Sequence, residues 1–472
     1  MAAVLESTLP APGVRDWLER AQVPYRVLSR GPAATLCQAA DACGVPREHL
    51  ARAVVLMDAK GLIMAVLPAG HLLDFQALGR LLQRDLEPVP ATRLAGLLED
   101  CEPGSCPPLP GLWRMEAVVD ESLLALDTVV FEPGTRRVLV AVSGADFRRL
   151  LGDARSAGFA RPVDALEVPR ADPDAGSFLR DAVAHFIPAR VQHALEEIHE
   201  LPALPDSARC LLQLARDPRA GARELAAVIE RDAALASQVL RYANSPLYGH
   251  SGRIANLQSA IARVLGFDFV LHLALGISVG RSLRVPADGP LGLNAYWRDS
   301  LHCARLVERL ALAMPRSLQP RRGTVYLAGL LHNLGTLVLG QAFQAEFFLL
   351  NRYLQVNPHL PARLVERYVL GASHEHAGAW LLQSWSLPEE LVAAAAHHHD
   401  PDYWGRHAVY PQLVLLADRL LRGHGMGDAD STGLPGFTLE ILGLDAGRVR
   451  TEAASLLQDG GELDAIASRF AA

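Results

Sequence analysis

The chain has 472 residues, of which 50% are hydrophobic and 21% are charged. This balance is typical of globular proteins and excludes a wholly disordered chain, and the length predicts two or three domains. The net charge is −7, and Lys60 is the only lysine among the 45 basic residues. The composition therefore differs from that of a strongly basic nucleic-acid-binding protein.

The cysteines and the N-terminus indicate where the protein works. The six cysteines contain no Cys-x-x-Cys pair, which argues against a zinc ribbon or a thioredoxin-like motif, and they are too sparse for a disulfide scaffold. The first twenty residues lack the basic and apolar regions of a signal peptide. The most apolar stretch, residues 267–280, carries Asp268 and His272 and is too short to span a bilayer. We therefore expect a cytoplasmic protein with no membrane association.

Residues 1–152 mix helical and strand patterns. Apolar residues spaced three and four apart predict helices at residues 13–21, 35–45, 75–84 and 91–100. Strand-like composition predicts a strand at residues 25–30 and hairpins at residues 52–68 and 127–143. Strands interleaved with helices indicate an α+β domain with a mixed sheet.

The rest of the chain changes character twice. Residues 153–186 are rich in Pro, Asp, Gly and Ser with little periodicity, which predicts a linker, with a hinge as the alternative. From residue 187 onward, apolar residues recur three and four apart, so we expect an all-α domain at 187–425 and a C-terminal helical extension at 426–472. The predicted fold class is an α+β N-terminal domain followed by an all-α domain.

Seven segments of the second part resemble, in order, the HDOD family, a non-catalytic relative of the HD and HD-GYP phosphohydrolases. These segments are residues 201–218, 224–249, 256–275, 329–339, 374–391, 397–401 and 415–420. The resemblance covers about residues 187–425. It implies a helical domain of bacterial signal transduction, with protein partners in signalling.

HD hydrolases use His and Asp side chains from several helices to hold metal ions that activate water against a phosphoester. The resemblance places the corresponding positions at Asp299, His332, Asn333, His374, His398 and Asp418. Asn333 stands where the hydrolases have a carboxylate, and Asp299 stands at the upstream histidine position with His302 one turn later. Thr336 replaces the lysine usual in catalytic HD-GYP proteins.

The loss of a carboxylate ligand weakens a hard divalent-cation site. We therefore predict that these positions are remnants, with no bound metal, no cofactor and no catalysis in this domain. Two alternatives are a weak structural metal and a metal-dependent phosphohydrolase acting on cyclic dinucleotides. His332 has a further interpretation as a hydrogen-bonded histidine in a polar core.

Most of the first third resembles the YbaK family of aminoacyl-tRNA deacylases, which is related to the insertion domain of prolyl-tRNA synthetase. The matching segments are residues 35–74, 103–111 and 117–151. The resemblance implies a pocket that hydrolyses the ester of a mischarged tRNA, with candidate catalytic residues Arg52, Gly104 and Asp120. Arg52 replaces the lysine of the family, and these two side chains are not equivalent at a point contact. Gly104 and Asp120 also have simpler interpretations, as a turn glycine and a strand-end carboxylate.

Charge bears on whether tRNA is a partner. Residues 1–160 contain 16 basic and 19 acidic residues, whereas affinity for tRNA comes largely from contacts with its phosphates. The arginines that could form a local basic patch are Arg136, Arg137, Arg148 and Arg149, and their alternative is a solvated surface.

These observations leave two main functional hypotheses. The first is a cytoplasmic signalling or regulatory protein with a degenerate HD-type scaffold and a YbaK-like binding or editing domain. The alternative is a trans-acting aminoacyl-tRNA deacylase with an HDOD regulatory module, for which tRNA would be the partner.

Overall fold

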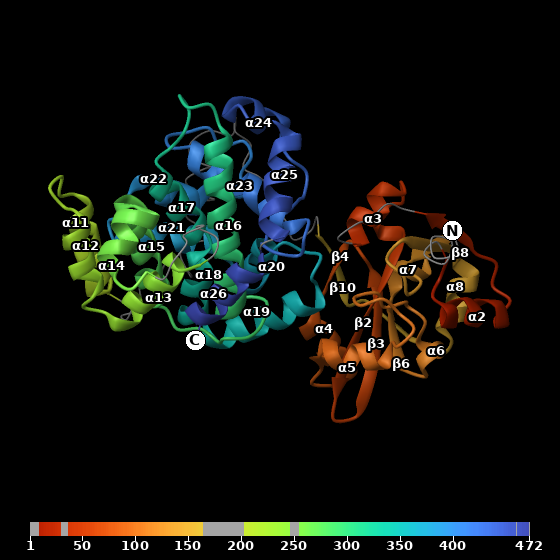
Figure 1. Cartoon of the computed structure of the whole chain (residues 1–472). Coiled ribbons are helices and arrows are strands. Elements are labelled where there is room, and N and C mark those ends of the chain that lie inside the picture. The colour runs from red at the N-terminus through yellow and green to blue at the C-terminus, as the bar shows by residue number, and fades with distance from the viewer. Residues whose placement is uncertain (1–8, 30–35, 164–202, 246–253, 459, 472) are drawn as a thin grey trace, which may run out of the picture. The chain divides into compact units, whose positions relative to one another are not determined.

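The computed structural model describes residues 9–29, 36–163, 203–245, 254–458 and 460–471. The chain forms two compact units (Figure 1). The first unit comprises residues 1–170 together with a short later segment, Arg352–Leu360, and the second comprises residues 171–351 and 361–472. Each unit is described separately.

A mixed sheet forms the centre of the first unit, with strand order β1-β8-β7-β2-β3-β6-β9 and β5 paired to β2. Its strands are β1 (Arg26–Ser29), β2 (Leu50–Asp58), β3 (Gly61–Pro68), β5 (Glu87–Pro88), β6 (Glu116–Asp120), β7 (Thr128–Phe131), β8 (Val138–Ser143) and β9 (Arg155–Ala157). The pairs β2–β7, β3–β6 and β6–β9 are parallel, and the others are antiparallel. A separate ribbon pairs β4 (His71–Leu73) with β10 (Ala160–Pro162).

Short helices accompany this sheet. They are α2 (Pro12–Arg20), α3 (Leu36–Ala42), the 3-10 helix η1 (Arg47–His49), α4 (Phe75–Leu82), α5 (Ala91–Leu97), α6 (Pro110–Trp113), α7 (Glu121–Leu124) and α8 (Gly144–Leu151). Asp74, Asp120 and Ser143 cap the N-termini of α4, α7 and α8 by accepting hydrogen bonds from backbone N–H groups. The sheet has a core on each face, because alternate residues point to opposite sides: Val129 and Phe131 belong to the larger core and Val130 to the smaller one. The predicted α+β class is confirmed, and so are the helices and hairpins predicted from residue periodicity.

The hairpin of β2 and β3 is fixed by charged groups at its turn. Asp58 accepts a hydrogen bond from the backbone N–H of Lys60 (2.7 Å). It also accepts hydrogen bonds from Nε (2.9 Å) and Nη2 (2.6 Å) of Arg84. Arg84 also donates to Glu116 Oε2 (2.8 Å) at the start of β6. This network therefore ties the hairpin to the neighbouring parallel strand.

Part of the segment predicted as linker is ordered in the first unit. β9 pairs with β6 and β10 pairs with β4. The carboxylate of Asp120 accepts hydrogen bonds from the N–H groups of Phe159 (3.0 Å), which precedes β10, and Ala160 (2.8 Å), its first residue. Strands of three residues carry no readable alternation, so sequence periodicity does not reveal them. Residues 164–186 lie outside the described residues, and the predicted domain boundaries stay predictions.

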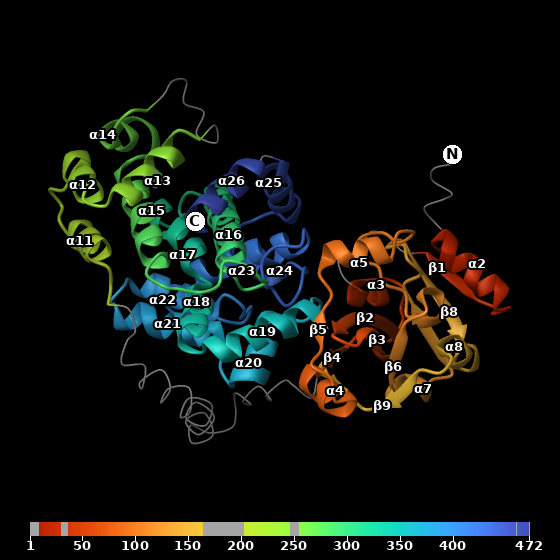
Figure 2. The same ribbon diagram turned by 90° about the horizontal axis from the view of Figure 1, so that it is seen from below.

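Helices and connecting loops make up all described residues of the second unit (Figure 2), which confirms the all-α prediction. The helices are α11 (Asp206–Ala215), α12 (Ala222–Ile229), α13 (Ala233–Ala243), α14 (Leu257–Ser259), the π-helical η4 (Ala260–Leu265), α15 (Phe267–Gly280), α16 (Leu293–Ala313), α17 (Arg322–Leu331), α18 (Leu334–Ala342), α19 (Gln344–Val356), α20 (Ala362–Leu370), α21 (His374–Ser384), α22 (Glu389–His397), α23 (Val409–Arg422), α24 (Gly436–Leu442), α25 (Ala446–Gln458) and α26 (Gly460–Ala471). The last residues of α19 belong to the first unit.

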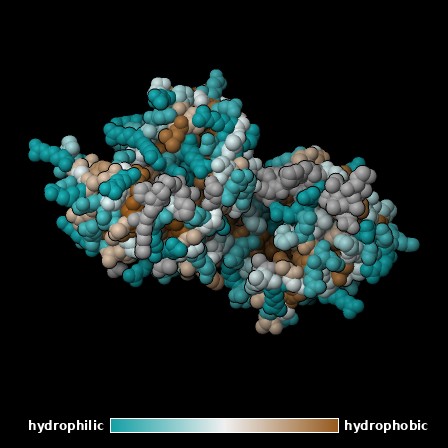
Figure 3. Space-filling model, in the orientation of Figure 1, coloured by the Kyte–Doolittle hydropathy of each residue, from teal (hydrophilic) through white to brown (hydrophobic). Residues whose placement is uncertain are grey.

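One hydrophobic core runs through the second unit. The long helix α16 packs against α17, α23, α25 and α26, and α15 packs against α11 and α17. Within the described residues, the stretch Arg322–Ala342 is long and apolar enough to cross a membrane, but 94% of its most apolar window is buried in the fold, as expected of core helices. Hydrophilic side chains cover much of the face seen in Figure 3, and apolar colour appears there in small patches.

Candidate functional site

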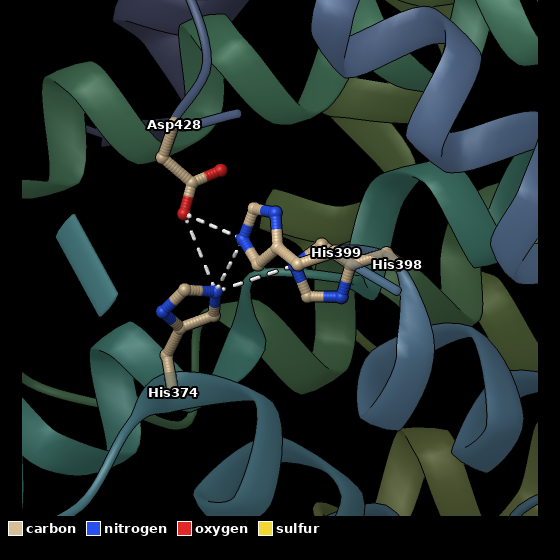
Figure 4. A group of neighbouring side chains, drawn as sticks. All are labelled: His374, His398, His399 and Asp428. Carbon is tan, nitrogen blue, oxygen red and sulfur yellow. Dashed lines mark hydrogen bonds and ion pairs between the residues drawn. The ribbon is translucent and has the colours of Figure 1, made fainter. Parts of the chain in front are cut away.

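Three histidines and one aspartate meet in the interior of the second unit (Figure 4). The Nε2 atom of His374 lies 3.2 Å from Nε2 of His398 and 3.3 Å from Nε2 of His399. Oδ2 of Asp428 lies 3.3 Å from Nε2 of both His374 and His399. These four atoms all lie within 4.8 Å of one another, so the cluster can hold a metal ion at its centre. We call these four residues the His₃Asp cluster.

The helices that carry the histidines fix their orientation. His374 is the first residue of α21, and His398 and His399 follow the C-terminus of α22. His374 Nδ1 lies 2.8 Å from Oε2 of the buried Glu366, and His398 Nδ1 lies 2.9 Å from the carbonyl oxygen of Ala395. These acceptors assign the proton of the neutral rings to Nδ1, which leaves the Nε2 lone pairs directed at the centre of the cluster. Metal-binding histidines are commonly oriented in this way.

Close packing places His374 in the cluster. Gly335 on α18 faces the start of α21, where a Cβ atom would collide with the backbone oxygen of His374 and the backbone nitrogen of Gly378. The absence of a side chain at residue 335 therefore lets α18 and α21 approach closely. This contact sets the position of His374 relative to the helices behind it.

Three of the positions predicted to be remnants of an HD metal site orient Asp428 and are not part of the His₃Asp cluster. Gly427 has φ = +72° and donates its N–H to Oδ2 of Asp299 (3.1 Å). The N–H of Asp428 donates to Oδ1 of Asp418 (3.2 Å), and Nδ2 of Asn333 donates to Oδ1 of Asp428 (3.2 Å). The side chains of Asp299, Asn333 and Asp418 thus hold the loop that supplies Asp428.

His332 lies beside the cluster and has unused bonding capacity. Its Nδ1 lies 2.8 Å from the carbonyl oxygen of Gly329, and its ring meets that of His398 edge-on at 5.0 Å. His332 Nε2 and Asp418 Oδ2 are buried without a hydrogen-bond partner in the described part of the chain. Ligand atoms of His332, Asp418 and Asp428 lie within 4.8 Å of one another, which makes a second group adjoining the first.

Burial and nearby charges set the protonation of these groups. Burial lowers the pKa of His332 to about 4, so the ring is neutral at pH 7. Burial also lowers the pKa of His374, but the carboxylates of Glu366, Glu375 and Asp428 outweigh it and raise that pKa to about 10. Burial and the neighbouring Asp428 raise the pKa of Asp418 well above its ordinary value. Without a metal ion, His374 is therefore doubly protonated at pH 7, and its Nε2 lone pair is free only after the Nε2 proton has left.

The structure brings together five of the six predicted positions, which are His332, Asn333, His374, His398 and Asp418. The sixth, Asp299, contacts this group indirectly, by accepting the hydrogen bond from the N–H of Gly427. The predictions did not include His399 or Asp428. Two signals in the sequence pointed to them: the adjacent histidines 397–399, and the Gly-Asp-Ala-Asp run at residues 427–430. The expectation that no metal binds was made without these two residues, and it stays a prediction.

The candidate deacylase residues lie on three different elements of the first unit, and β3 lies between the strands that carry Arg52 and Asp120. Arg52 is on β2 and is buried, Gly104 has φ = +85° in an exposed turn, and Asp120 ends β6. Both carboxylate oxygens of Asp120 accept hydrogen bonds, from Ser122 at the start of α7 and from the backbone between β9 and β10. Asp120 therefore has a structural role in connecting three segments of the chain.

Comparison with protein families finds two matches along the chain. The HDOD domain matches residues 201–401, and the aminoacyl-tRNA editing domain matches residues 30–150. The His₃Asp cluster spans the end of the first match and the loop beyond it, since Asp428 lies outside residues 201–401. Arg52, Gly104 and Asp120 all lie within the second match.

Two individual proteins are similar to parts of the chain. An uncharacterized protein of Treponema pallidum (strain Nichols) is 26% identical over 205 residues, which are 43% of this chain and 39% of that protein, so the chain spans about two fifths of that relative's length. A trans-editing enzyme for prolyl-tRNA synthetase matches 32% of this chain and 97% of its own at 23% identity, with a TM-score of 0.28.

A signal transduction protein from Marinobacter aquaeolei VT8 matches over almost its whole length. Its crystal structure covers 98% of this chain and 100% of that chain, with 30% identity and a TM-score of 0.81. The chain therefore belongs to the same family as the Marinobacter protein, and it carries an aminoacyl-tRNA editing domain followed by an HDOD domain.

Proposed function

We propose that this chain is a regulatory protein whose second, helical unit binds one transition-metal ion through His374, His398 and His399 of the HDOD domain and Asp428 of the loop beyond it. One observation carries the proposal. Metal–nitrogen bonds of about 2.0–2.1 Å in a tetrahedral zinc site separate the ligand atoms by about 3.3–3.4 Å. Four of the separations in the His₃Asp cluster are 3.2 or 3.3 Å. Three imidazoles and one carboxylate suit zinc, nickel or iron.

The number of protein ligands argues for binding rather than catalysis. Catalytic zinc sites keep one coordination position for water or substrate, whereas structural sites fill all four with protein side chains. The His₃Asp cluster supplies four ligand atoms, and Asn333 removes the carboxylate that a second, bridged metal would need. The name of the Marinobacter relative, a signal transduction protein, agrees with a regulatory role.

Metal titration tests this proposal. Chelator-treated protein should bind one equivalent of zinc per chain, and His399→Ala should lose that binding. The control is His397→Ala, because His397 is adjacent in sequence but stacks on Tyr403 with ring centroids 3.7 Å apart, away from the cluster. Equal zinc binding by wild type and His399→Ala would refute the site. Hydrolysis of bis-p-nitrophenyl phosphate by the zinc-loaded protein would instead favour a phosphohydrolase.

Aminoacyl-tRNA deacylation is the second candidate function, and the editing-domain match at residues 30–150 favours it. Hydrolysis of a panel of misacylated tRNAs, including Ala-tRNA(Pro) and Cys-tRNA(Pro), tests it directly. We expect turnover near background for the wild type, because arginine replaces the lysine of the family at Arg52. Substantial turnover that is abolished by Arg52→Ala would support the deacylase.

A further inference from the structure

The first unit contains a short segment from a distant part of the sequence, Arg352–Leu360. This segment supplies two hydrogen-bond acceptors to Arg52, a residue that is only 6% exposed. Arg52 Nη1 donates to the carbonyl oxygen of Val356 (2.8 Å) and Nη2 donates to Oδ1 of Asn357 (2.7 Å), across 304 and 305 residues of chain. Nη2 also approaches the carbonyl oxygen of His71 (3.3 Å).

Asn357 pairs with an edge of β4. Its fully buried side chain accepts a hydrogen bond from the N–H of Leu73 (2.7 Å) and donates from Nδ2 to the carbonyl oxygen of Leu73 (3.3 Å). The strand β10 pairs with β4 as well, so β4 is bonded to both a strand and a side-chain amide. The amide of Asn357 therefore does what the peptide group of an added strand does in peptide recognition.

Two other side chains anchor the same segment. The hydroxyl of Tyr353 donates to Oδ1 of Asp74 (3.1 Å), the residue that caps α4. Arg352 donates to the carbonyl oxygen of Leu86 (2.8 Å) and forms an ion pair with Glu87 (3.3 Å). These contacts are directional and polar, as in a bound peptide, and they include main-chain groups of the host unit.

We propose that Arg52 and the backbone of Leu73 form a binding site of the first unit, and that Arg352–Leu360 is its internal ligand, with Asn357 as the recognised group. The site is closed while the segment is bound and opens when the segment leaves. This proposal goes beyond the metal site of the HDOD domain and does not rest on it.

The contacts define what can replace the segment. A competing ligand must offer an acceptor oxygen to Arg52 and to the N–H of Leu73, and a donor to the carbonyl oxygen of Leu73. An aminoacyl ester meets these requirements with its carbonyl oxygen and its α-amino group. The choice of this ligand rests on the second candidate function, whereas the closure by Asn357 does not.

Chemical modification of Arg52 by phenylglyoxal, measured on full-length protein by peptide mass spectrometry, tests the closure. Asn357→Ala removes one of the acceptors of Arg52, the Oδ1 atom that faces Nη2, together with both contacts between Asn357 and Leu73. It should therefore raise the modification rate of Arg52. Asn351→Ala is the matched control. Asn351 is also a buried asparagine on α19, and it accepts from the N–H of Leu291 (2.9 Å) in the second unit. It should leave Arg52 protected.

Two milder variants keep the test decisive if Asn357→Ala does not fold. Asn357→Asp keeps both acceptor contacts of Oδ1 but loses the donor to the carbonyl oxygen of Leu73, so it should raise the modification of Arg52 less than Asn357→Ala does. Tyr353→Phe removes a single hydroxyl and should give a smaller rise in modification. Unchanged protection of Arg52 in folded Asn357→Ala and Tyr353→Phe would overturn the proposal. A wild-type protein in which phenylglyoxal modifies Arg52 as fast as it does in these variants would overturn it as well.

Deacylation of Ala-tRNA(Pro) by the same variants separates this inference from the second candidate function. Faster modification of Arg52 together with new deacylation in Asn357→Ala supports both the closure and the aminoacyl ester as a competing ligand. Faster modification without deacylation supports the closure and refutes the deacylase.

Discussion

Asp58 links the stability of the first unit to pH through a single carboxylate. Hydrogen bonds from Arg84 lower the pKa of Asp58 from 3.8 to about 2, against the opposing effect of burial. A group with a lowered folded-state pKa stabilises the fold above its unfolded-state value, and that contribution disappears as the pH falls through the folded-state value. Asp58→Asn should therefore lower the thermal midpoint at pH 6, and the difference from the wild type should shrink as the pH falls from 4 towards 2.

Thermal unfolding from pH 6 down to the acid limit of the fold measures this difference. Asp85→Asn is the control, because Asp85 is a nearby exposed carboxylate. A difference between Asp58→Asn and the wild type that stays constant down to pH 2 would contradict the assignment.

Asn333 determines how many metal ions the interior of the HDOD domain can hold. His332 Nε2 and Asp418 Oδ2 are buried without partners beside it in the described structure, so two ligand atoms are already in place. Asn333→Asp adds a third ligand and a negative charge, and should allow a second equivalent of zinc, measured by elemental analysis after dialysis. Asn333→Leu is the control and should bind no more than one. One equivalent in a folded Asn333→Asp variant would show that packing, and not the missing carboxylate, prevents the second ion.

At the scale of elements, the contact between α18 and α21 decides whether the His₃Asp cluster forms. Gly335→Ala places a Cβ atom against the backbone of α21, where no flexible side chain can move aside. Overpacking of this kind costs about 1–3 kcal/mol, and the displacement of His374 should weaken zinc binding as well. Gly436→Ala in α24 is the control, because a Cβ atom there meets no other atom within 4 Å. Urea unfolding and zinc titration measure the two effects, and unchanged zinc affinity in Gly335→Ala would contradict this role of the contact.

The elements were largely predictable from the sequence, and the site was predictable only in part. The periodicity of α2 and α4 is a local property, so their predicted ranges agree with the structure to within two residues. The short strands β4, β5, β9 and β10 depend on partners elsewhere in the chain and leave no local pattern. His374 and His398 were identified through the HD pattern, but Asp428 reaches them from a loop after α23. Its place in the cluster depends on Gly427 and the buried carboxylates around it, which no local pattern encodes.

At the scale of the whole molecule, the two units have separate hydrophobic cores, so a ligand of one need not stabilise the other. Zinc at one hundred times its dissociation constant should stabilise the HDOD domain by about 2.7 kcal/mol. Hydrogen exchange should therefore slow in α21, α22 and α23 and remain unchanged in β2, β3 and β8. His399→Ala is the control and should show no effect of zinc. Equal slowing in the sheet would show that the two units unfold as one.

The placement of Arg352–Leu360 has a consequence for how this protein can be divided. The chain passes from the first unit to the second, returns for nine residues, and then leaves again. No single cut in the gene separates the two units as they are folded here. A product ending at residue 170 would lack the segment that contacts Arg52, Leu73 and Asp74. Expression of residues 1–170 alone would therefore leave Arg52 without the two acceptors that Val356 and Asn357 supply.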